Sequence, residues 1–181
     1  GLKPPQFEAS IVTVSHDHYD HNNTKALRGS PYVVNSAGEY DIQGVGIQGV
    51  ESYHDEQQGK ERGPNIIYRI EIDEVSVVHL GDLGNILENK QLEAIGRTDI
   101  LLVPVGGTYT LDAKKAAEVV NQIEPRMVIP MHYSIPGLKV KIAGVEPFIK
   151  EMGIKPQTED KLKISRKDLP QEEMELILFK P

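Results

Sequence analysis

The run Ile11-Val12-Thr13-Val14 leads directly into a dense group of polar residues that begins at His16. A continuous apolar and β-branched run of this kind is typical of a strand covered on both faces. Alternating apolar and polar residues over 40–53, 66–72 and 75–80 then predict β-hairpins, with a turn at Asp73-Glu74. The chain is therefore expected to begin as a series of strands whose ends carry polar side chains.

The second half of the chain alternates strands with helices. Buried-strand patterns at residues 100–103 and 127–129 flank an amphipathic segment that predicts a helix over 113–123, capped by Thr110. Two more helices are expected near residues 88–95 and 145–152, and short strands near 162–164 and 176–179. Since no repeat or linker interrupts the pattern, we expect one α/β domain over residues 1–181.

Composition narrows the class of protein. The sequence has 20 Lys and Arg against 27 Asp and Glu, a net charge of −7, so we do not expect nucleic acid as a partner. No apolar run approaches the ~20 residues that cross a bilayer, and the first residues form no apolar signal segment. We therefore expect no membrane association and a cytoplasmic location. The absence of Cys leaves histidine and carboxylate side chains to bind any metal.

Three of the six histidines fall in the segment His16-Asp17-His18-Tyr19-Asp20-His21. His16 and His18 would point the same way in an extended chain, and a turn at Tyr19 would bring Asp20 and His21 beside them. Four such ligands exceed the three protein ligands of a single catalytic zinc site, which favours two ions. Imidazole with carboxylate suits Zn, Mn or Fe. The alternative is a solvated histidine-rich turn without metal.

This segment resembles the H-x-H-x-D-H motif of the metallo-β-lactamase superfamily, and the order of later residues is similar. His54, Asp82 in Gly81-Asp82-Leu83-Gly84, and His132 each follow an expected strand. Taken singly, each has a simpler reading, as a loop histidine, an Asx turn and a strand-end histidine. Residues 53–59, 62–65, 105–112 and 130–133 further resemble a branch of metal-dependent hydrolases that also contains L-ascorbate 6-phosphate lactonase.

The resemblance implies a four-layer αββα sandwich with its metals at the edge where strands of both sheets end. The superfamily usually opens with a β-hairpin and an Asp-Pro loop, which this sequence does not show, so we expect the fold to lack its opening β-hairpin. By the same resemblance, one metal site takes His16, His18 and His54, the other takes Asp20, His21 and His132, and Asp82 bridges them.

Two cations held in this way would bridge a water molecule and lower its pKa toward ~7, so that hydroxide forms at neutral pH. Asp82 would balance the charge between the ions and Asp20 would orient the water, which makes both candidate catalytic residues. We expect a metal-dependent hydrolase with two divalent ions, preferably Zn, acting on a small-molecule ester, lactone or phosphoester. The alternatives are a ribonuclease or phosphodiesterase of the same superfamily and a non-catalytic metal-binding protein. Assembly into a homo-oligomer is left open.

A few other residues are candidates for supporting roles. His79 is interpreted as structural or as a partner of a ligand. The remaining candidates, each with ordinary packing or solvation as the alternative, are Asp17 and Asp55 as partners of ligands, Tyr109, Tyr133 and Asn65 as pocket residues, and Gly106-Gly107-Thr108 as an anion cradle before a helix.

Overall fold

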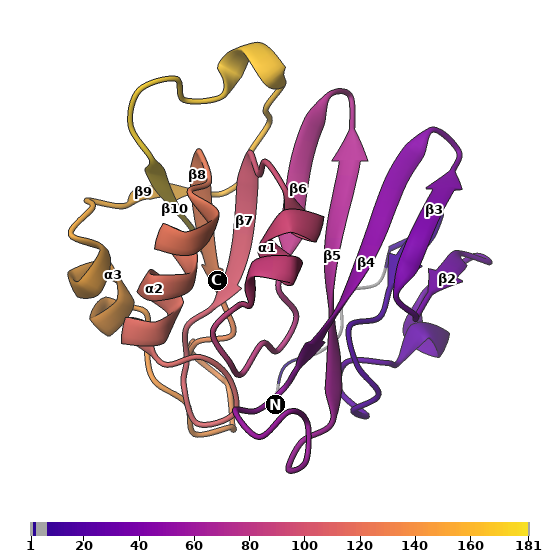
Figure 1. Cartoon of the computed structure of the whole chain (residues 1–181), viewed down its shortest axis with the longest axis horizontal. Coiled ribbons are helices and arrows are strands. Elements are labelled where there is room, and N and C mark those ends of the chain that lie inside the picture. The colour runs from indigo at the N-terminus through magenta and orange to yellow at the C-terminus, as the bar shows by residue number, and fades with distance from the viewer. Residues whose placement is uncertain (1, 3–6, 181) are drawn as a thin grey trace.

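The structure is a computed structural model that describes Leu2 and residues 7–180. Most strands join one eight-stranded sheet, and two form a small separate sheet (Figure 1). The strands are β1 (Ile11–Thr13), β2 (Tyr32–Val34), β3 (Gly38–Ile42), β4 (Val45–Tyr53), β5 (Pro64–Ile72), β6 (Val75–His79), β7 (Ile100–Pro104), β8 (Met127–Met131), β9 (Gln157–Glu159) and β10 (Glu175–Phe179). The α-helices are α1 (Asn89–Ile95), α2 (Ala113–Ile123) and α3 (Glu146–Met152), and 3-10 helices cover Thr24–Ala26 and Arg166–Asp168.

The large sheet has the strand order β3-β4-β5-β6-β7-β8-β10-β9. Strands β3 to β6 are antiparallel neighbours, as the alternating sequence predicts, and β6, β7, β8, β10 and β9 are mutually parallel. Since β4 and β6 both run antiparallel to β5, they point the same way as β7 and β8. The carboxyl ends of β4, β6, β7 and β8 therefore lie at one edge of the sheet.

All three helices lie on one face of this sheet (Figure 1). The apolar stripe of α2, which includes Ala116 and Val120, packs on Leu101, Val103 and Val128 of the central strands. Because these strands are covered by helices on this face, their sequences are nearly continuous runs of apolar residues. This packing holds the carboxyl ends of β6, β7 and β8 in fixed positions.

The opposite face of the sheet is covered in two places. Near β4 and β5, the small sheet of β1 and β2 contributes Ile11 and Val34 to a cluster with Ile47 and Tyr68. Near β7, β8 and β10, an irregular segment that carries Leu162, Ile164 and Leu169 packs on Ile100, Ile129 and Ile177. The expected α/β class is confirmed. Within the described residues, the side opposite the helices holds two short strands and two 3-10 turns instead of a full second pair of layers.

Three local predictions are wrong. Residues 162–164 form no strand, because their apolar side chains pack over the sheet without pairing, and the nearby strand is β9. Thr110 does not cap α2, since the Asp112 side chain accepts the hydrogen bond from Lys115 N. The strand at residues 11–13 is only half-buried, because the small sheet it forms with β2 packs on the large sheet through one face, which includes Ile11 and Val34. No described helix is long and apolar enough to cross a membrane.

Candidate metal centre

The polar cluster forms where strands of both sheets end. His16, His18 and His21 follow β1, His54 follows β4, Asp82 follows β6 and His132 follows β8. The parallel register of β6, β7 and β8 and the direction of β4 place the last three residues at one edge. The small sheet brings the β1 loop to the same edge through a hydrogen bond from Ile66 N to Ser15 O.

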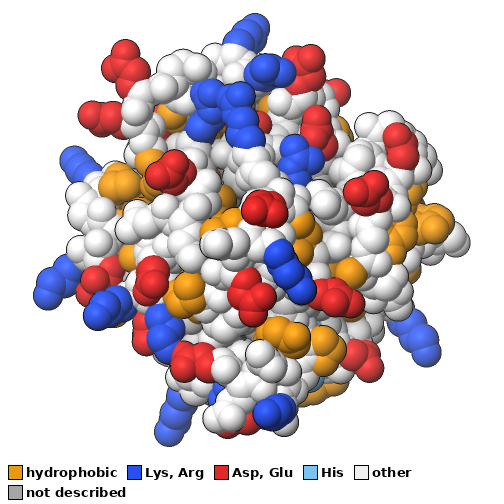
Figure 2. All heavy atoms as spheres, in the orientation of Figure 1, with side chains coloured by type: hydrophobic (Ala, Val, Ile, Leu, Met, Phe, Trp, Pro, Cys, Tyr) orange, Lys and Arg blue, Asp and Glu red, His pale blue; other side chains and the backbone are white. Residues whose placement is uncertain are grey.

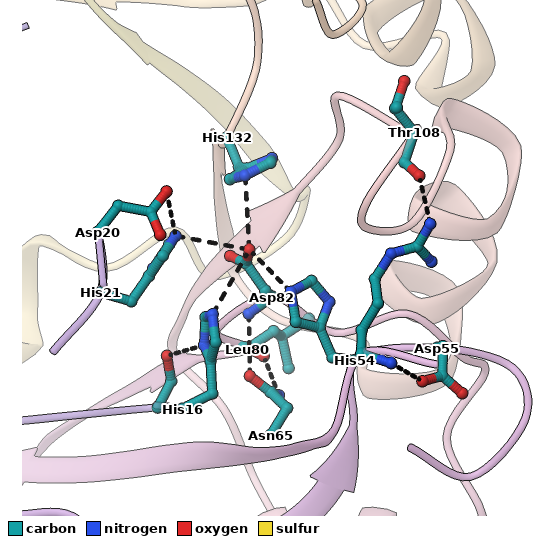
Figure 3. Close-up of polar contacts among 12 residues, drawn as sticks. His16, Asp20, His21, His54, Asp55, Asn65, Leu80, Asp82, Thr108 and His132 are labelled. Carbon is teal, nitrogen blue, oxygen red and sulfur yellow. Dashed lines mark hydrogen bonds and ion pairs between the residues drawn. The ribbon is translucent and has the colours of Figure 1, made fainter. Parts of the chain in front are cut away.

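The carboxylate of Asp82 lies at the centre of the cluster (Figure 3). Its Oδ2 atom lies 3.4 Å from His54 Nε2, 3.5 Å from His132 Nε2, 3.6 Å from His21 Nε2 and 3.9 Å from His16 Nε2. These separations are too long for ordinary hydrogen bonds. Tetrahedral ligands each about 2.0–2.2 Å from a zinc ion would have donor atoms about 3.3–3.6 Å apart. The spacing around Asp82 therefore fits a shared cation better than direct hydrogen bonds.

Two overlapping groups of side chains have ligand atoms close enough to hold an ion. His16, His18 and His54 form one group, and His16, His21 and Asp82 form the other, with ligand atoms within 4.8 Å of one another. His132 joins through its contact with Asp82. Asp20 is more remote: its carboxylate is half-exposed and lies 3.9 Å from His21 Nε2. The structure thus brings all seven candidate ligands to one place, and their roles as ligands remain a prediction.

Several nitrogens in this cluster have no hydrogen-bond partner in the described part of the chain. His16 Nε2, His54 Nδ1 and His132 Nδ1 are buried and make no hydrogen bond among the described residues. A buried polar atom without a partner costs about 1–3 kcal/mol. Of these atoms only His16 Nε2 faces Asp82, and it is the one that a divalent cation of the Zn, Mn or Fe type in the cluster would satisfy.

Burial also sets the protonation of the two innermost histidines. Loss of hydration lowers the pKa of His16 to about 4, although the nearby Asp82 carboxylate opposes the shift. Burial likewise lowers the pKa of His54, again against Asp82, and the charge of Arg62 adds to the lowering. Both rings are therefore neutral at pH 7 and keep a lone pair for a metal. His16 Nδ1 lies 3.0 Å from Ser15 Oγ, which fixes the ring orientation.

Asn65 holds the backbone of the Asp82 loop, a role that the sequence did not reveal. Its side-chain Oδ1 accepts from Asp82 N at 3.0 Å, while Nδ2 donates to Leu80 O at 2.9 Å and to Ser52 Oγ at 2.7 Å. We expected Asn65 as a pocket residue, but the structure places it beneath the loop, where it is 1% exposed. Only the pairing of β5 with β4 and β6, which no short motif encodes, positions it there.

Close backbone approach joins the Asp82 loop to the His54 loop. Gly84 N donates to Tyr53 O at 3.0 Å, and a Cβ atom at Gly84 would overlap the carbonyl group of His54. Glycine is therefore required at residue 84 by contact with neighbouring backbone. At the third segment, His132 itself has a φ of 52°, a left-handed conformation that is uncommon for residues other than glycine.

The remaining supporting candidates make hydrogen bonds mainly within their own loops. Asp55 accepts hydrogen bonds from four backbone N–H groups, those of residues 57, 59, 61 and 62, and organises the loop after His54. His79 Nδ1 accepts from Gly81 N, a structural role as predicted. Asp17 accepts from Asn22 within its own loop. Of Gly106-Gly107-Thr108, Gly107 N donates to Leu111 O, and the anion cradle expected at these residues stays a prediction.

A cavity of about 740 Å³ opens beside Asp82. Its floor includes His18, Asp20, His21, His54 and His132, and Tyr109 and Tyr133 line it as predicted. The remaining lining includes Arg62 and the apolar side chains of Ile135, Leu138, Val140 and Ile142. Sequence reasoning missed this apolar group because it lies on an irregular segment without the periodicity of a helix or strand.

Fold and site together define a metallo-β-lactamase-like protein, and comparison with known families agrees. Residues 1–132 match the family model of the beta-lactamase superfamily domain. The chain belongs to this family. The resemblance to the branch that contains L-ascorbate 6-phosphate lactonase stays a prediction.

Relatives within the family are similar along most of the chain. A Thermococcus onnurineus protein named UPF0173 metal-dependent hydrolase is 31% identical over 157 residues, which cover 73% of this chain and 70% of that protein. A crystal structure of a Thermotoga maritima protein, described as a candidate Zn-dependent hydrolase of the metallo-beta-lactamase superfamily, is 35% identical, with a TM-score of 0.78 and coverage of 97% of this chain and 84% of that one. Igni18, a metallo hydrolase of Ignicoccus hospitalis, shares the fold at 21% identity and a TM-score of 0.60, over 81% and 72% of the two chains.

Proposed function

We propose that the protein is a metal-dependent hydrolase that holds two divalent cations in the histidine and aspartate cluster and cleaves a small ester, lactone or phosphoester. The central observation is that a single carboxylate oxygen of Asp82 lies 3.4–3.9 Å from the Nε2 atoms of four histidines. The names of the relatives in Thermococcus onnurineus and Thermotoga maritima support the same reaction type.

The spacing supports a division of the ligands between two ions. His16, His18 and His54 form one compact group, which suits one ion. His21 Nε2 and His132 Nε2 lie 3.6 Å and 3.5 Å from the same Asp82 oxygen and, with Asp20, suit the second ion. The two ions would then share Asp82. His16 belongs to one compact group with His18 and His54 and to another with His21 and Asp82, so it lies near both proposed ions. Zinc is the preferred ion, since neutral imidazole and carboxylate ligands suit it, with Mn and Fe as alternatives.

When bound, such cations lower the pKa of water and polarise a carbonyl or phosphoryl oxygen. The side chains of the site would supply the negative charge, the neutral ligands and the orientation of the water. Asp82 supplies negative charge at the centre of the site, and the low pKa of His16 keeps that ring neutral at pH 7. Asp20 lies half-exposed on the lining of the cavity, where its carboxylate can accept a hydrogen bond from an attacking water.

The surroundings of the site favour a small molecule over nucleic acid. A cavity of about 740 Å³ falls within the usual size for small-ligand sites, about 300–1,000 Å³. The net charge is −7, and on the face shown in Figure 2 acidic and basic side chains are interspersed without a continuous basic stripe. Binding to a polyanion would depend on such a stripe.

The test combines metal analysis with turnover. Elemental analysis of the purified protein should give close to two metal ions per chain, and the metal-loaded protein should hydrolyse p-nitrophenyl acetate or bis(p-nitrophenyl) phosphate. Asp82→Asn should lose metal and reduce kcat/KM by about 100-fold or more, because it removes the shared charge. Asp41→Asn, an exposed residue of β3, is the matched control and should leave both unchanged.

Three results would contradict the proposal. Metal content near zero after supplementation would remove the basis of the site. Two bound metals without turnover of any ester, lactone or phosphoester would favour a non-catalytic metal-binding protein. Cleavage of RNA that falls steeply with salt concentration would favour the nuclease alternative.

A further inference from the structure

One wall of the cavity beside Asp82 is apolar. Ile135, Leu138, Val140 and Ile142 line it, all from the irregular segment between β8 and α3. These side chains are half-buried or exposed, and none belongs to the main clusters of the core. Covering this apolar surface with an apolar part of a ligand removes it from water, which favours binding.

Among the described residues that line this cavity, Arg62 is the only Lys or Arg. Arg62 is anchored at its backbone, where its N–H donates to Asp55 Oδ2 at 2.8 Å. Its guanidinium Nη2 donates to Thr108 O at 3.2 Å, and Cζ lies 5.7 Å from the centroid of the Tyr109 ring. The side chain is therefore held at both ends before any ligand arrives.

The charge of Arg62 has no acidic partner in the described part of the chain. Other arginines do: Arg69 pairs with Glu71, Arg126 with Asp99 and Arg166 with Glu74. A guanidinium has five N–H donors, and the hydrogen bond to Thr108 O uses only one nitrogen of Arg62. A half-buried, positioned arginine with donors to spare at the edge of a cavity is suited to bind a planar carboxylate through two hydrogen bonds.

We propose that the cavity takes an ester with two recognised ends: an apolar portion that lies on the wall of Ile135, Leu138, Val140 and Ile142, and a non-reacting carboxylate that binds Arg62. A carboxylate is the better match for one guanidinium than a phosphate dianion, because the described lining residues include no second Lys or Arg for the second charge of the phosphate. This inference rests on the proposed hydrolase function. In the reaction, water adds to the ester carbonyl, the bond from the carbonyl carbon to the alcohol oxygen breaks, and the alcohol leaves with a proton.

Two esters that differ only at the recognised end test the proposal. Mono-p-nitrophenyl adipate and p-nitrophenyl hexanoate have the same six-carbon acyl chain and the same aromatic leaving group, but only the first carries a terminal carboxylate. The metal-loaded protein should prefer the adipate ester. Arg62→Gln should raise KM for the adipate ester about tenfold or more, because a hydrogen bond to a charged group usually contributes about that much to affinity. The same variant should change KM for the hexanoate ester less than about twofold.

Matched variants separate recognition from a structural role. Arg62→Lys keeps the charge but loses the planar fork, so KM for the adipate ester should lie between the wild-type and Arg62→Gln values. Arg69→Gln, which changes an arginine outside the cavity, should not alter the preference. Leu138→Ser should raise KM for both esters, since both carry the aromatic ring. If Arg62 only anchors the loop at Thr108, Arg62→Gln should impair both esters equally, and that result would overturn the proposal.

A binding measurement keeps the proposal testable even if the protein hydrolyses neither ester. Adipic acid monoanilide and hexananilide replace the ester by an amide, and their affinities can be compared by calorimetry on the purified protein. We expect the monoanilide to bind about tenfold more tightly, and Arg62→Gln to remove the difference. Equal affinities, or a difference that persists in Arg62→Gln because the carboxylate binds elsewhere, would refute the role of Arg62 without bearing on hydrolysis itself.

Discussion

The side chain of Asn65 holds the main chain of Asp82: Asn65 Oδ1 accepts a hydrogen bond from Asp82 N at 3.0 Å, and both residues are buried. Through Nδ2 the same amide reaches Leu80 O and Ser52 Oγ, so it joins β4, β5 and the loop after β6. The central carboxylate of the cluster is therefore positioned by a residue that does not face the cavity. In the proposed function Asp82 is a metal ligand, and groups that orient a ligand in this way contribute strongly to metal affinity.

We predict that Asn65→Asp weakens both the fold and the site. A carboxylate can still accept from Asp82 N, but it cannot donate to Leu80 O, which is left without that partner at a cost of about 1–3 kcal/mol. Metal affinity should fall about 10–100-fold. Urea unfolding with chelator present measures the first effect and competitive zinc titration the second. Asn121→Asp, on the exposed side of α2, should change neither, and an unchanged zinc affinity in Asn65→Asp would show that Asn65 does not position Asp82.

Gly84→Ala should destabilise the protein because the new methyl group would overlap the backbone of His54. Main-chain atoms cannot move aside as a flexible side chain would, so we expect a loss of about 2–3 kcal/mol or more in the free energy of unfolding. Gly46→Ala is the control, since a Cβ there meets only ordinary contacts at 3.8 Å or more. Denaturant unfolding of both variants, compared with the wild type, checks the prediction. Equal stability of the two variants would show that the two loops can separate at little cost.

Tyr68 connects the small sheet to the large one. Its hydroxyl lies 3.0 Å from both Val14 O and Val34 O, and burial raises the pKa of Tyr68, so the hydroxyl keeps its proton. Tyr68→Phe should leave both carbonyl groups without this donor and lower the free energy of unfolding by about 1–3 kcal/mol. Tyr32→Phe, at an exposed position, should stay within about 0.5 kcal/mol of the wild type in the same measurement. A loss of equal size in both variants would contradict the role assigned to the Tyr68 hydroxyl.

The loop after His54 should depend on pH through Asp55. Burial alone would raise the pKa of this carboxyl, but hydrogen bonds from the backbone of residues 62, 57, 61 and 59 outweigh it and hold the pKa below 3.8. The ionised form therefore stabilises the fold above pH 3.8, and this contribution is lost as the pH falls through the lowered pKa. The stability difference between wild type and Asp55→Asn should be largest near pH 7 and shrink below pH 3.8.

Chemical denaturation of both proteins from pH 3 to pH 7, with chelator present throughout, measures this difference. Asp41→Asn serves as the control at an exposed carboxylate. A difference between wild type and Asp55→Asn that stays constant across the range would mean that ionisation of Asp55 does not support the loop.

Much of the fold could be predicted because its signals are local. The alternation in β3 to β6 and the apolar face of α2 are properties of neighbouring residues, and the structure confirms them. Strand β9 could not be found in the same way, since its residues Gln157, Thr158 and Glu159 are all exposed and pair with β10 through the main chain alone. Leu162 and Ile164 produced the opposite error, because two apolar residues at a spacing of two indicate a strand whether or not a partner exists.

In the candidate site, too, the residues that could be predicted are those with a local signal in the sequence. The motif at residues 16–21 can be recognised as a candidate metal site because it holds three histidines and two aspartates within six residues. The resemblance to the family then adds His54, Asp82 and His132, which occur in the expected order. Asn65, Gly84 and the apolar wall near Leu138 depend instead on contacts between segments that are distant in sequence. Such contacts follow from the register of the sheet, which no single stretch of residues specifies.

The small sheet of β1 and β2 shares no strand with the large sheet, and the two are joined mainly by the hydrogen bonds of Ile66 and Tyr68 and by an apolar cluster. Four of the candidate donors, His16, His18, Asp20 and His21, lie on the loop that follows β1, while His54, Asp82 and His132 follow strands of the large sheet. An ion bound between them would act as a cross-link between the two sheets. Binding of metal would then fix the small sheet of β1 and β2 against the large sheet. The protein would become active and this small sheet would become rigid in the same step.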